Sequence, residues 1–409
     1  MILRNLQWQT LAQAGGRGLM LLAHLLLPLW MGWEAYGTFM LVWVWLAVLV
    51  HPLVDGGVNP LITGDVARGH VATASHAQAF RATVAVAVLP LVAAVTAWQG
   101  LAPATVAGLW AWFVLLSLAM TAMAVFRGLE RMELEALLSL TMRAAILLAL
   151  GALFLLGALT PASAAAVLAG AAALMLVPAS VLAWRLLRRA VPTAAVAWPG
   201  RTALLAFARR GLPLTLVMMS SVLYLRVDSI MLGALVGEAA VAHYQVPFRL
   251  VEAAFMLPII AVVALYPQIA RAERARRRRL LGRGLAGVAA LGLALALVFA
   301  VAGPPLFARF YGDAAARAIE TLVVLSWAIP FAFLAQFLAR VLPLYGLQMR
   351  LAVLGGLGLA VNIAVNAVLI PAYAEIGAAL TTILTQAGVA AGAFALLRRG
   401  ERHGPAAPG

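Results

Sequence analysis

The chain is built from long apolar segments separated by short polar stretches. Each segment runs for about 20 residues without the every-second-residue alternation of a half-buried strand, and this length matches a helix that crosses a membrane. Only helices and closed barrels satisfy their backbone hydrogen bonds inside a bilayer, so the pattern selects helices. The twelve predicted segments are 10–33, 36–58, 81–101, 104–126, 138–160, 163–187, 212–235, 240–269, 284–306, 318–341, 350–372 and 375–397.

Composition excludes a water-soluble enzyme. Hydrophobic residues make up 65% of the 409 residues and charged residues only 11%, whereas a soluble domain carries about 25% charged residues. The chain has no cysteine, so disulfides, thiolate metal sites and a catalytic cysteine are excluded as well. We therefore expect an all-α, polytopic membrane protein.

The distribution of basic residues predicts the topology. All 29 basic residues are arginine; with a cytoplasmic N-terminus, 24 of them fall in the inside segments and only Arg309 and Arg317 fall outside. Cytoplasmic loops are enriched in arginine, so both termini are predicted to be cytoplasmic. The inside set includes Arg81 and Arg143. It also includes the run 276–279, and we interpret this run as a contact with anionic headgroups and not with nucleic acid.

The two halves of the chain share a spacing. In the first half Tyr36 precedes Pro60 by 24 residues, and in the second half Tyr244 precedes Pro267 by 23. Both halves hold six segments and begin inside, which indicates a parallel repeat with the substrate between the halves near the membrane midplane. The predicted pseudo-symmetric lobes are residues 1–200, with a cytoplasmic linker, and 201–409.

Several short motifs occur in order along most of the chain. They are WEAYG at 33–37, DGGVNP at 55–60, FRGLERM at 126–132, VDSIMLG at 227–233, NAVLIP at 366–371 and IGAA at 376–379. With these motifs the sequence resembles the polysaccharide (Wzx-type) flippases of the multidrug/oligosaccharidyl-lipid/polysaccharide (MOP) exporter superfamily. The resemblance implies a MATE-like fold with two six-helix lobes around a central cavity. It also implies translocation of a polyprenyl-diphosphate-linked oligosaccharide (an O-antigen, capsule or exopolysaccharide repeat unit) across the bacterial inner membrane.

Three arginines fall well inside predicted helices: Arg17, Arg226 and Arg249. A charge at mid-membrane is costly, and it usually faces a cavity or a partner. Arg17 has no acidic residue one turn away, so we expect an anion or another helix to pair with it, and a guanidinium fits a diphosphate. Arg249 and Glu252 are three residues apart and can pair, either in packing or as part of a substrate site.

Two further polar positions complete the candidate site. Asn366 is a candidate substrate ligand, although Asn362 and Asn366 lie one turn apart and can equally join helices by hydrogen bonds. Asp228 and Glu252 are candidates for binding a coupling proton or Na⁺, while membrane potential acting on an anionic substrate is an equal alternative. No catalytic constellation, Walker loop or cofactor motif is present.

The sequence leaves other functions open. A multidrug/cation antiporter of the same fold would need an acidic residue in the cavity of the first lobe. The first helix instead contains the basic residue Arg17 and no carboxylate. A major-facilitator-type transporter is suggested by residues 64–69, which resemble that class's loop signature, but its second-half equivalent is missing. A membrane glycosyltransferase or ligase is disfavoured by the short outside loops. The interpretation as a flippase predicts lipid-linked oligosaccharide and membrane lipids as partners, with a polysaccharide polymerase as a further candidate.

Overall fold

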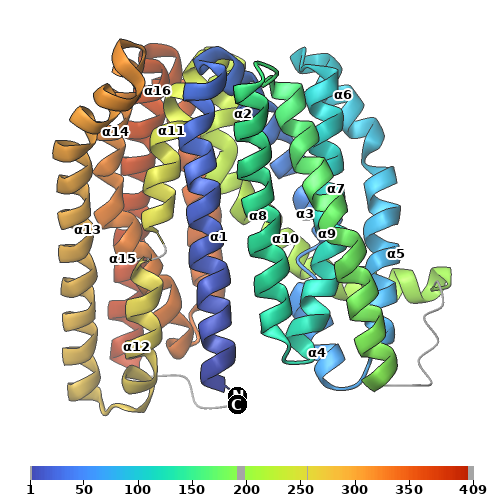
Figure 1. Ribbon diagram of the computed structural model, residues 1–409. Coiled ribbons are helices and arrows are strands. Elements are labelled where there is room, and N and C mark those ends of the chain that lie inside the picture. Colours follow the sequence, from blue (N-terminus) through green and yellow to red (C-terminus); the bar gives the residue numbers. More distant parts are fainter. Residues whose placement is uncertain (1, 191–198, 256, 404–409) are drawn as a thin grey trace. The chain divides into compact units, whose positions relative to one another are not determined.

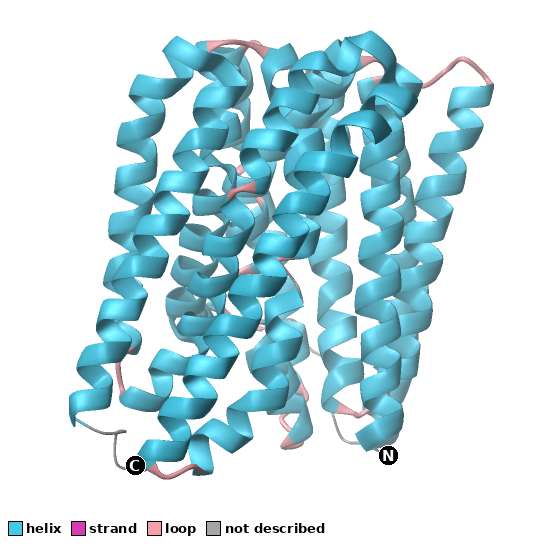
Figure 2. Ribbon diagram, turned by 90° about the vertical axis from the view of Figure 1, so that its left-hand side faces the viewer, coloured by secondary structure: helices cyan, strands magenta, loops and turns pink. Residues whose placement is uncertain are grey.

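The computed structural model describes residues 2–190, 199–255 and 257–403. The described residues form helices joined by short turns, with no strand among them (Figures 1 and 2). The chain divides into two compact units, Met1–Arg226 and Val227–Gly409. The boundary falls inside the helix Arg201–Leu235, which contributes to both units, so the division of the sequence repeat near residue 200 stays a prediction.

The first unit contains nine helices within its described residues, together with most of a tenth. They are α1 (Ile2–Met31), α2 (Trp33–Leu49), α3 (His51–Asp55), α4 (Asn59–Ala67), α5 (Ala72–Ala87), α6 (Leu89–Gln99), α7 (Pro103–Gly128), α8 (Met132–Leu155), α9 (Pro161–Ala190) and α10 (Arg201–Leu235).

Helix α7 is the centre of the first unit, because it packs against α2, α3, α4, α5, α8 and α9. Its last residue, Gly128, approaches α4 closely: a Cβ there would lie 2.8 Å from the Thr63 carbonyl oxygen and 2.9 Å from Val66. Small residues of this kind let membrane helices pack backbone to backbone. This accounts for the glycine of the motif at 126–132.

The second unit contains the end of α10 and the helices that follow it. They are α11 (Glu238–Ala254), α12 (Leu257–Arg271), α13 (Arg274–Tyr311), η1 (Gly312–Ala315), α14 (Ala316–Ser326), α15 (Ala328–Val341), η2 (Leu342–Tyr345) and α16 (Gln348–His403). Helices α14 and α15 are separate pieces of one predicted segment. The break between them at Trp327 comes three residues before Pro330, whose ring cannot continue the backbone hydrogen bonds of a helix.

Helix α16 is a hairpin of two antiparallel arms. The helical dihedral angles are interrupted at Ala374 (φ 50°, ψ −128°). On either side of this turn, Asn362 donates to Thr385, and a Cβ on Gly392 would meet Leu354 at 2.6 Å. Residues equally far before and after Ala374 therefore face each other, which separates α16 into the two predicted segments 350–372 and 375–397.

The predicted all-α membrane fold is confirmed. Ten stretches of the described residues are long and apolar enough to cross a membrane, and the hairpin of α16 divides one of them into two. Each of the twelve predicted segments coincides with a helix, a bent pair of helices or one arm of α16.

Many of the arginines counted in the inside loops lie within helices, because the helices extend beyond the predicted apolar runs. Helix α5 begins at Ala72 and helix α8 at Met132, both earlier than the apolar runs that predicted them. Arg81 and Arg143, which the count of basic residues placed in the inside loops, therefore lie within helices, while the predicted topology stays a prediction. The cause is that each helix extends through a polar but Ala- or Leu-containing stretch, in which the charge of the arginine is compensated by contacts with other residues.

Candidate functional site

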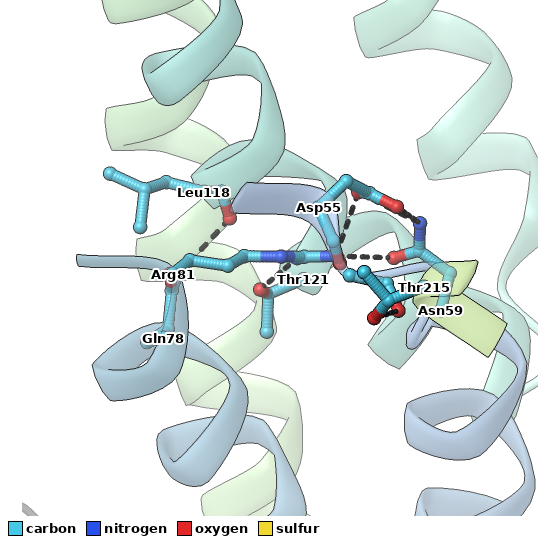
Figure 3. A network of polar contacts seen from close by, with 8 residues as sticks. Asp55, Asn59, Gln78, Arg81, Leu118, Thr121 and Thr215 are labelled. Atoms are coloured by element: carbon cyan, nitrogen blue, oxygen red, sulfur yellow. Dashed lines mark hydrogen bonds and ion pairs between the residues drawn. The ribbon is translucent and has the colours of Figure 1, made fainter. Parts of the chain in front are cut away.

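A fully buried arginine organises one polar cluster of the first unit. Arg81, on α5, is 0% exposed. Its Nη2 donates to Asp55 Oδ1 at 2.9 Å and to Asn59 Oδ1 at 3.0 Å, and its Nη1 donates to the Thr121 hydroxyl on α7 (Figure 3). Asn59 Nδ2 in turn donates to the Asp55 carboxylate at 3.2 Å. In this Arg81 cluster the positive charge is neutralised by Asp55, so the cluster is a closed ion pair.

The turn between α3 and α4 brings Asp55 and Asn59 together. Gly56 and Gly57 both adopt positive φ, 66° and 60°, which only glycine does at low cost. The turn also contacts α10: the Thr215 hydroxyl donates to the Gly56 carbonyl oxygen at 2.8 Å. A Cβ on Gly57 would lie 3.0 Å from the Leu214 carbonyl oxygen. The two glycines of the motif at 55–60 therefore serve the turn and the close approach of α10.

A second cluster of the first unit centres on Asp65, near the end of α4. Its side chain is 4% exposed and accepts hydrogen bonds from Arg68 at 2.7 Å and from Thr73 at 2.9 Å. Arg210 of α10 donates to both carboxylate oxygens, at 3.1 and 3.3 Å. These contacts connect the motif at 64–69, in the α4–α5 turn, to the first part of α10. We call Asp65, Arg68, Thr73 and Arg210 the Asp65 cluster.

In the second unit a buried carboxylate is surrounded by neutral donors. Asp228, on α10, is 4% exposed. It accepts hydrogen bonds from Tyr244 on α11 at 2.8 Å, from Asn366 on the first arm of α16 at 2.6 Å, and from Thr382 on the second arm at 3.2 Å. These four side chains form the Asp228 cluster. Within the described part of the chain, no arginine forms an ion pair with this carboxylate.

The hairpin of α16 extends this cluster. Asn366 Nδ2 also donates to Asn362 at 3.0 Å, and Asn362 donates to Thr385 at 3.5 Å. The Asn366 Oδ1 atom is buried and has no hydrogen-bond partner. Carboxylate, amide and hydroxyl oxygens gathered at one point suit a hard cation, and a carboxylate with no cationic partner can alternatively carry a proton.

The arginine and glutamate of α11 pair as the sequence predicts. Arg249 Nη1 donates to Glu252 Oε2 at 2.9 Å, and the two side chains are 11% and 26% exposed. The Nε and Nη2 atoms of Arg249 are buried and have no hydrogen-bond partner. Arg249 therefore retains donors that its glutamate does not use.

Arg17 lies near the middle of α1, and it forms no hydrogen bond or ion pair with another described residue. Its side chain is exposed. Arg226 is half-buried on α10 and is the last residue of the first unit. Of the predicted site residues, the structure brings Asp228 to Asn366 and Arg249 to Glu252. Both pairs belong to the second unit, and Arg17 belongs to the first.

The sequence matches the family described as "Polysaccharide biosynthesis protein" over residues 2–273, which is about two thirds of the chain. The chain belongs to this family. Residues 213–368 also match the MatE family. No curated protein matches the sequence.

Solved structures share the fold of this polysaccharide biosynthesis family member at low sequence identity. The lipid II flippase MurJ, in an inward closed conformation, aligns with a TM-score of 0.75 and 13% identity over 95% of this chain and 87% of its own. The Vibrio cholerae MATE transporter VcmN aligns with a TM-score of 0.63 and 15% identity over 98% of this chain and 96% of its own. A MOP superfamily transporter from Pyrococcus furiosus aligns with a TM-score of 0.55 and 16% identity over 98% and 92%. The predicted MOP-superfamily membership is confirmed, and the protein is a multi-pass membrane transporter or flippase of that superfamily.

Sequence reasoning counted Arg81 among the inside arginines of this family member and missed its burial against Asp55. Periodicity places the start of an apolar run and cannot show that a charged residue beyond it is buried by a partner from another helix. For Arg81 a signal exists, because Asp55 is the one acidic residue of the DGGVNP motif and it lies near the end of the predicted segment 36–58. An unpaired aspartate at such a position calls for a basic partner.

Proposed function

We propose that this protein translocates a polyprenyl-diphosphate-linked oligosaccharide, such as an O-antigen, capsule or exopolysaccharide repeat unit, from the inner to the outer leaflet of the bacterial cytoplasmic membrane. Both termini would lie in the cytoplasm, and a polysaccharide polymerase would be the natural recipient of the product. The observation that carries the proposal is the charge pattern of the first unit: its buried carboxylates are already paired with arginines, while Arg17 on α1 has no acidic partner among the residues that the structure describes.

The buried carboxylates of the first unit have no capacity left for a cationic substrate. Asp55 pairs with Arg81, and Asp65 pairs with Arg68 and Arg210. These carboxylates are already paired and would not bind a cationic substrate. The guanidinium of Arg17 could bind an anionic one. Moving a diphosphate through hydrocarbon alone is prohibitive, because even one unpaired ion costs many kcal/mol to bury. A fixed guanidinium replaces part of the water that the head group loses.

The second unit supports coupling to a cation. We propose that a proton or Na⁺ binds at the Asp228 cluster and drives alternating access, since Asp228 is buried with neutral donors only. Glu252, the other candidate, is already engaged by Arg249, so Asp228 is the better one. The tail of the lipid would stay in the bilayer while Arg17, with Arg249 or Arg226, holds the head group.

A multidrug/cation antiporter is the second candidate, and the same carboxylate favours it. Asp228 could bind an organic cation directly instead of a coupling ion. The two functions differ in the sign of the charge that the protein must carry. Transport of anionic and cationic substrates by one preparation therefore distinguishes them.

The decisive experiment reconstitutes the purified full-length protein in vesicles and measures translocation of a polyprenyl-diphosphate-linked sugar, with a cationic dye as the competing substrate. We expect flipping of the anionic lipid and no efflux of the dye. Arg17→Ala should abolish flipping, and Arg17→Lys should restore it in part, because a point charge lacks the two-pronged guanidinium. Arg309→Ala, which removes an exposed arginine, is the matched control. Efflux of the dye without lipid flipping would refute the proposal.

A further inference from the structure

Three buried polar atoms next to the Arg81 cluster have no hydrogen-bond partner among the described residues. They are Arg81 Nε and Gln78 Oε1 on α5, and Ser117 Oγ on α7. Arg81 and Ser117 are both 0% exposed. Buried polar groups in proteins nearly always have a partner, either in the protein or in bound water. These three atoms therefore indicate a ligand that hydrogen-bonds to them.

The three atoms lie along one short stretch of the contact between α5 and α7. Gln78 and Arg81 are three residues apart and share a face of α5. Gln78 Nε2 donates to the Leu118 carbonyl oxygen at 3.2 Å (Figure 3). Arg81 Nη1 donates to the Thr121 hydroxyl. Ser117 is one turn before Thr121 on the same face of α7, so both α5 side chains contact α7 within one turn of Ser117.

A histidine of α3 lies next to the same turn of α7. The rings of His51 and Phe113 have their centroids 5.6 Å apart, and Phe113 is one turn before Ser117. On α3, His51 is one turn before Asp55, and the charges of Asp55 and Arg81 both act on it. His51 Nδ1 is buried and has no hydrogen-bond partner in the described part of the chain. It is therefore a fourth polar atom for the same ligand.

The charges at this position select a neutral ligand. Asp55 repels an anion and Arg81 repels a cation, and the two already neutralise each other at 2.9 Å. The ligand must accept a hydrogen bond from Arg81 Nε and donate one to Gln78 Oε1, while the Ser117 hydroxyl can do either. Water is neutral, donates and accepts, and typically makes about three hydrogen bonds when it is buried.

We propose that Gln78, Arg81 and Ser117 bind an internal water molecule between α5 and α7, with His51 as a further partner. This water completes the hydrogen bonding of the Arg81 guanidinium. It also gives the buried ion pair a small mobile partner, which can replace either side chain when the helices shift. Arg81 and Asp55 can then separate without leaving either charge unsolvated. The proposal does not depend on which substrate the protein transports.

The first test detects the water by its chemistry. Short X-ray pulses convert protein-bound water into hydroxyl radicals, which oxidise adjacent side chains, and mass spectrometry locates the oxidised residues. The purified full-length protein in nanodiscs allows a matched comparison between Phe113, 4% exposed, and Phe307 of the second unit, 5% exposed. We expect several-fold more oxidation of Phe113, because burial shields both rings equally from bulk water. Equal oxidation of the two rings would overturn the proposal.

The second test uses the sign of a stability change. With water bound, Ser117→Ala removes one of its partners, so the unfolding midpoint should fall and the oxidation of Phe113 should drop to that of Phe307. Without water, the same change removes an unpaired buried hydroxyl, which leaves the midpoint unchanged or raises it. Ser220→Ala is the control, because this exposed hydroxyl donates to the Leu216 carbonyl oxygen of its own helix. A midpoint that does not fall in Ser117→Ala, or undiminished oxidation of Phe113, would overturn the proposal.

A double variant tests whether α5 and α7 bind the same water. Gln78→Met removes the partner on α5, and Ser117→Ala removes the partner on α7. If one water joins them, the double variant should lower the midpoint by less than the sum of the two single shifts. Gln78→Met combined with Ser220→Ala is the control and should be additive. Additive shifts for Gln78→Met and Ser117→Ala would show that the two side chains share no ligand, and the proposal would fail.

Discussion

Single side chains neutralise buried charge in different ways in the two units. In the first unit Asp55 is neutralised by Arg81, whose Nη2 donates to Asp55 Oδ1 at 2.9 Å. In the second unit Asp228 has a tyrosine, an asparagine and a threonine around it and no arginine among the described residues. The first arrangement is a fixed structural pair, and the second leaves a charge for a mobile ion to balance.

Removing one partner of the fixed pair should destabilise the protein. Arg81→Met would leave Asp55 buried and uncompensated, which costs about 3–5 kcal/mol. Thermal unfolding in detergent should show a large drop in midpoint for Arg81→Met, and Arg81→Met combined with Asp55→Asn should recover part of it. If the single and the double variant are equally unstable, the Arg81–Asp55 ion pair does not stabilise the packing of α3 against α5.

Neutralising Asp228 should remove coupling and leave the fold intact. Asp228→Asn keeps the size of the side chain and hydrogen-bonding contacts with its neighbours, but it offers no charge to a cation. We expect translocation by this variant to lose its dependence on a Na⁺ or proton gradient, and its melting temperature to stop responding to Na⁺ and to pH. Asp313→Asn, at an exposed carboxylate of η1, is the control. Unchanged gradient dependence would rule out Asp228 as the coupling site.

At the scale of helices, the hairpin of α16 determines whether the Asp228 cluster forms. Asn362 and Asn366 come from one arm and Thr382 and Thr385 from the other. The turn between the arms is made by Ala374, a non-glycine residue at φ 50°. The arms can bring their polar residues to Asp228 only while this turn holds.

The turn predicts a stabilising substitution. A side chain at positive φ costs about 1–2 kcal/mol that glycine avoids, so Ala374→Gly should stabilise the protein by about 1 kcal/mol and raise its unfolding midpoint. Ala372→Gly, two residues earlier in regular helix, should have the opposite sign because glycine weakens a helix interior. The two melting curves, measured side by side, test the turn geometry; a loss of stability in Ala374→Gly would contradict it.

The same scale shows which elements the sequence can predict. Long apolar runs such as 104–126 locate their helices well, since burial in lipid needs only length and composition. Helix starts in polar stretches are missed: α5 begins at Ala72, before the predicted segment, and its Arg81 pairs with Asp55, 26 residues away. That pairing is a tertiary contact, and no local pattern reveals it. Arg249 with Glu252 was predictable because both partners lie within one helical turn.

At the scale of the molecule, the chemistry of single residues is predictable from sequence and their grouping is not. Arg17, Asp228 and Asn366 stand out as polar residues in apolar helices. That Asp228 and Asn366 meet, 138 positions apart, depends on how three helices pack. The contact of Arg143 with Gly16 likewise depends on the packing of α8 against α1.

Helix α10 belongs to both compact units, since the boundary falls after Arg226 within it. Near its start, Arg210 is bound by the buried carboxylate of Asp65 at the α4–α5 turn. A movement of α10 relative to this turn would have to break that ion pair. The Asp65 cluster is therefore placed to influence how fast the transporter changes conformation, while it contains none of the predicted ligands of the substrate.

The last prediction follows from this placement. Arg210→Ala should change the rate of translocation several-fold and leave the affinity for polyprenyl diphosphate unchanged, because Arg210 is half-exposed and its pair contributes modestly, about 1 kcal/mol or less. Asp65→Ala should act in the same direction, and the double variant should be no more affected than Asp65→Ala alone, since both changes remove one contact. Initial rates in vesicles and binding in nanodiscs measure the two quantities. Arg209→Ala, at the exposed neighbouring arginine of α10, is the control. Additive effects of the two substitutions, or an altered affinity, would show that the ion pair does not act on the conformational step.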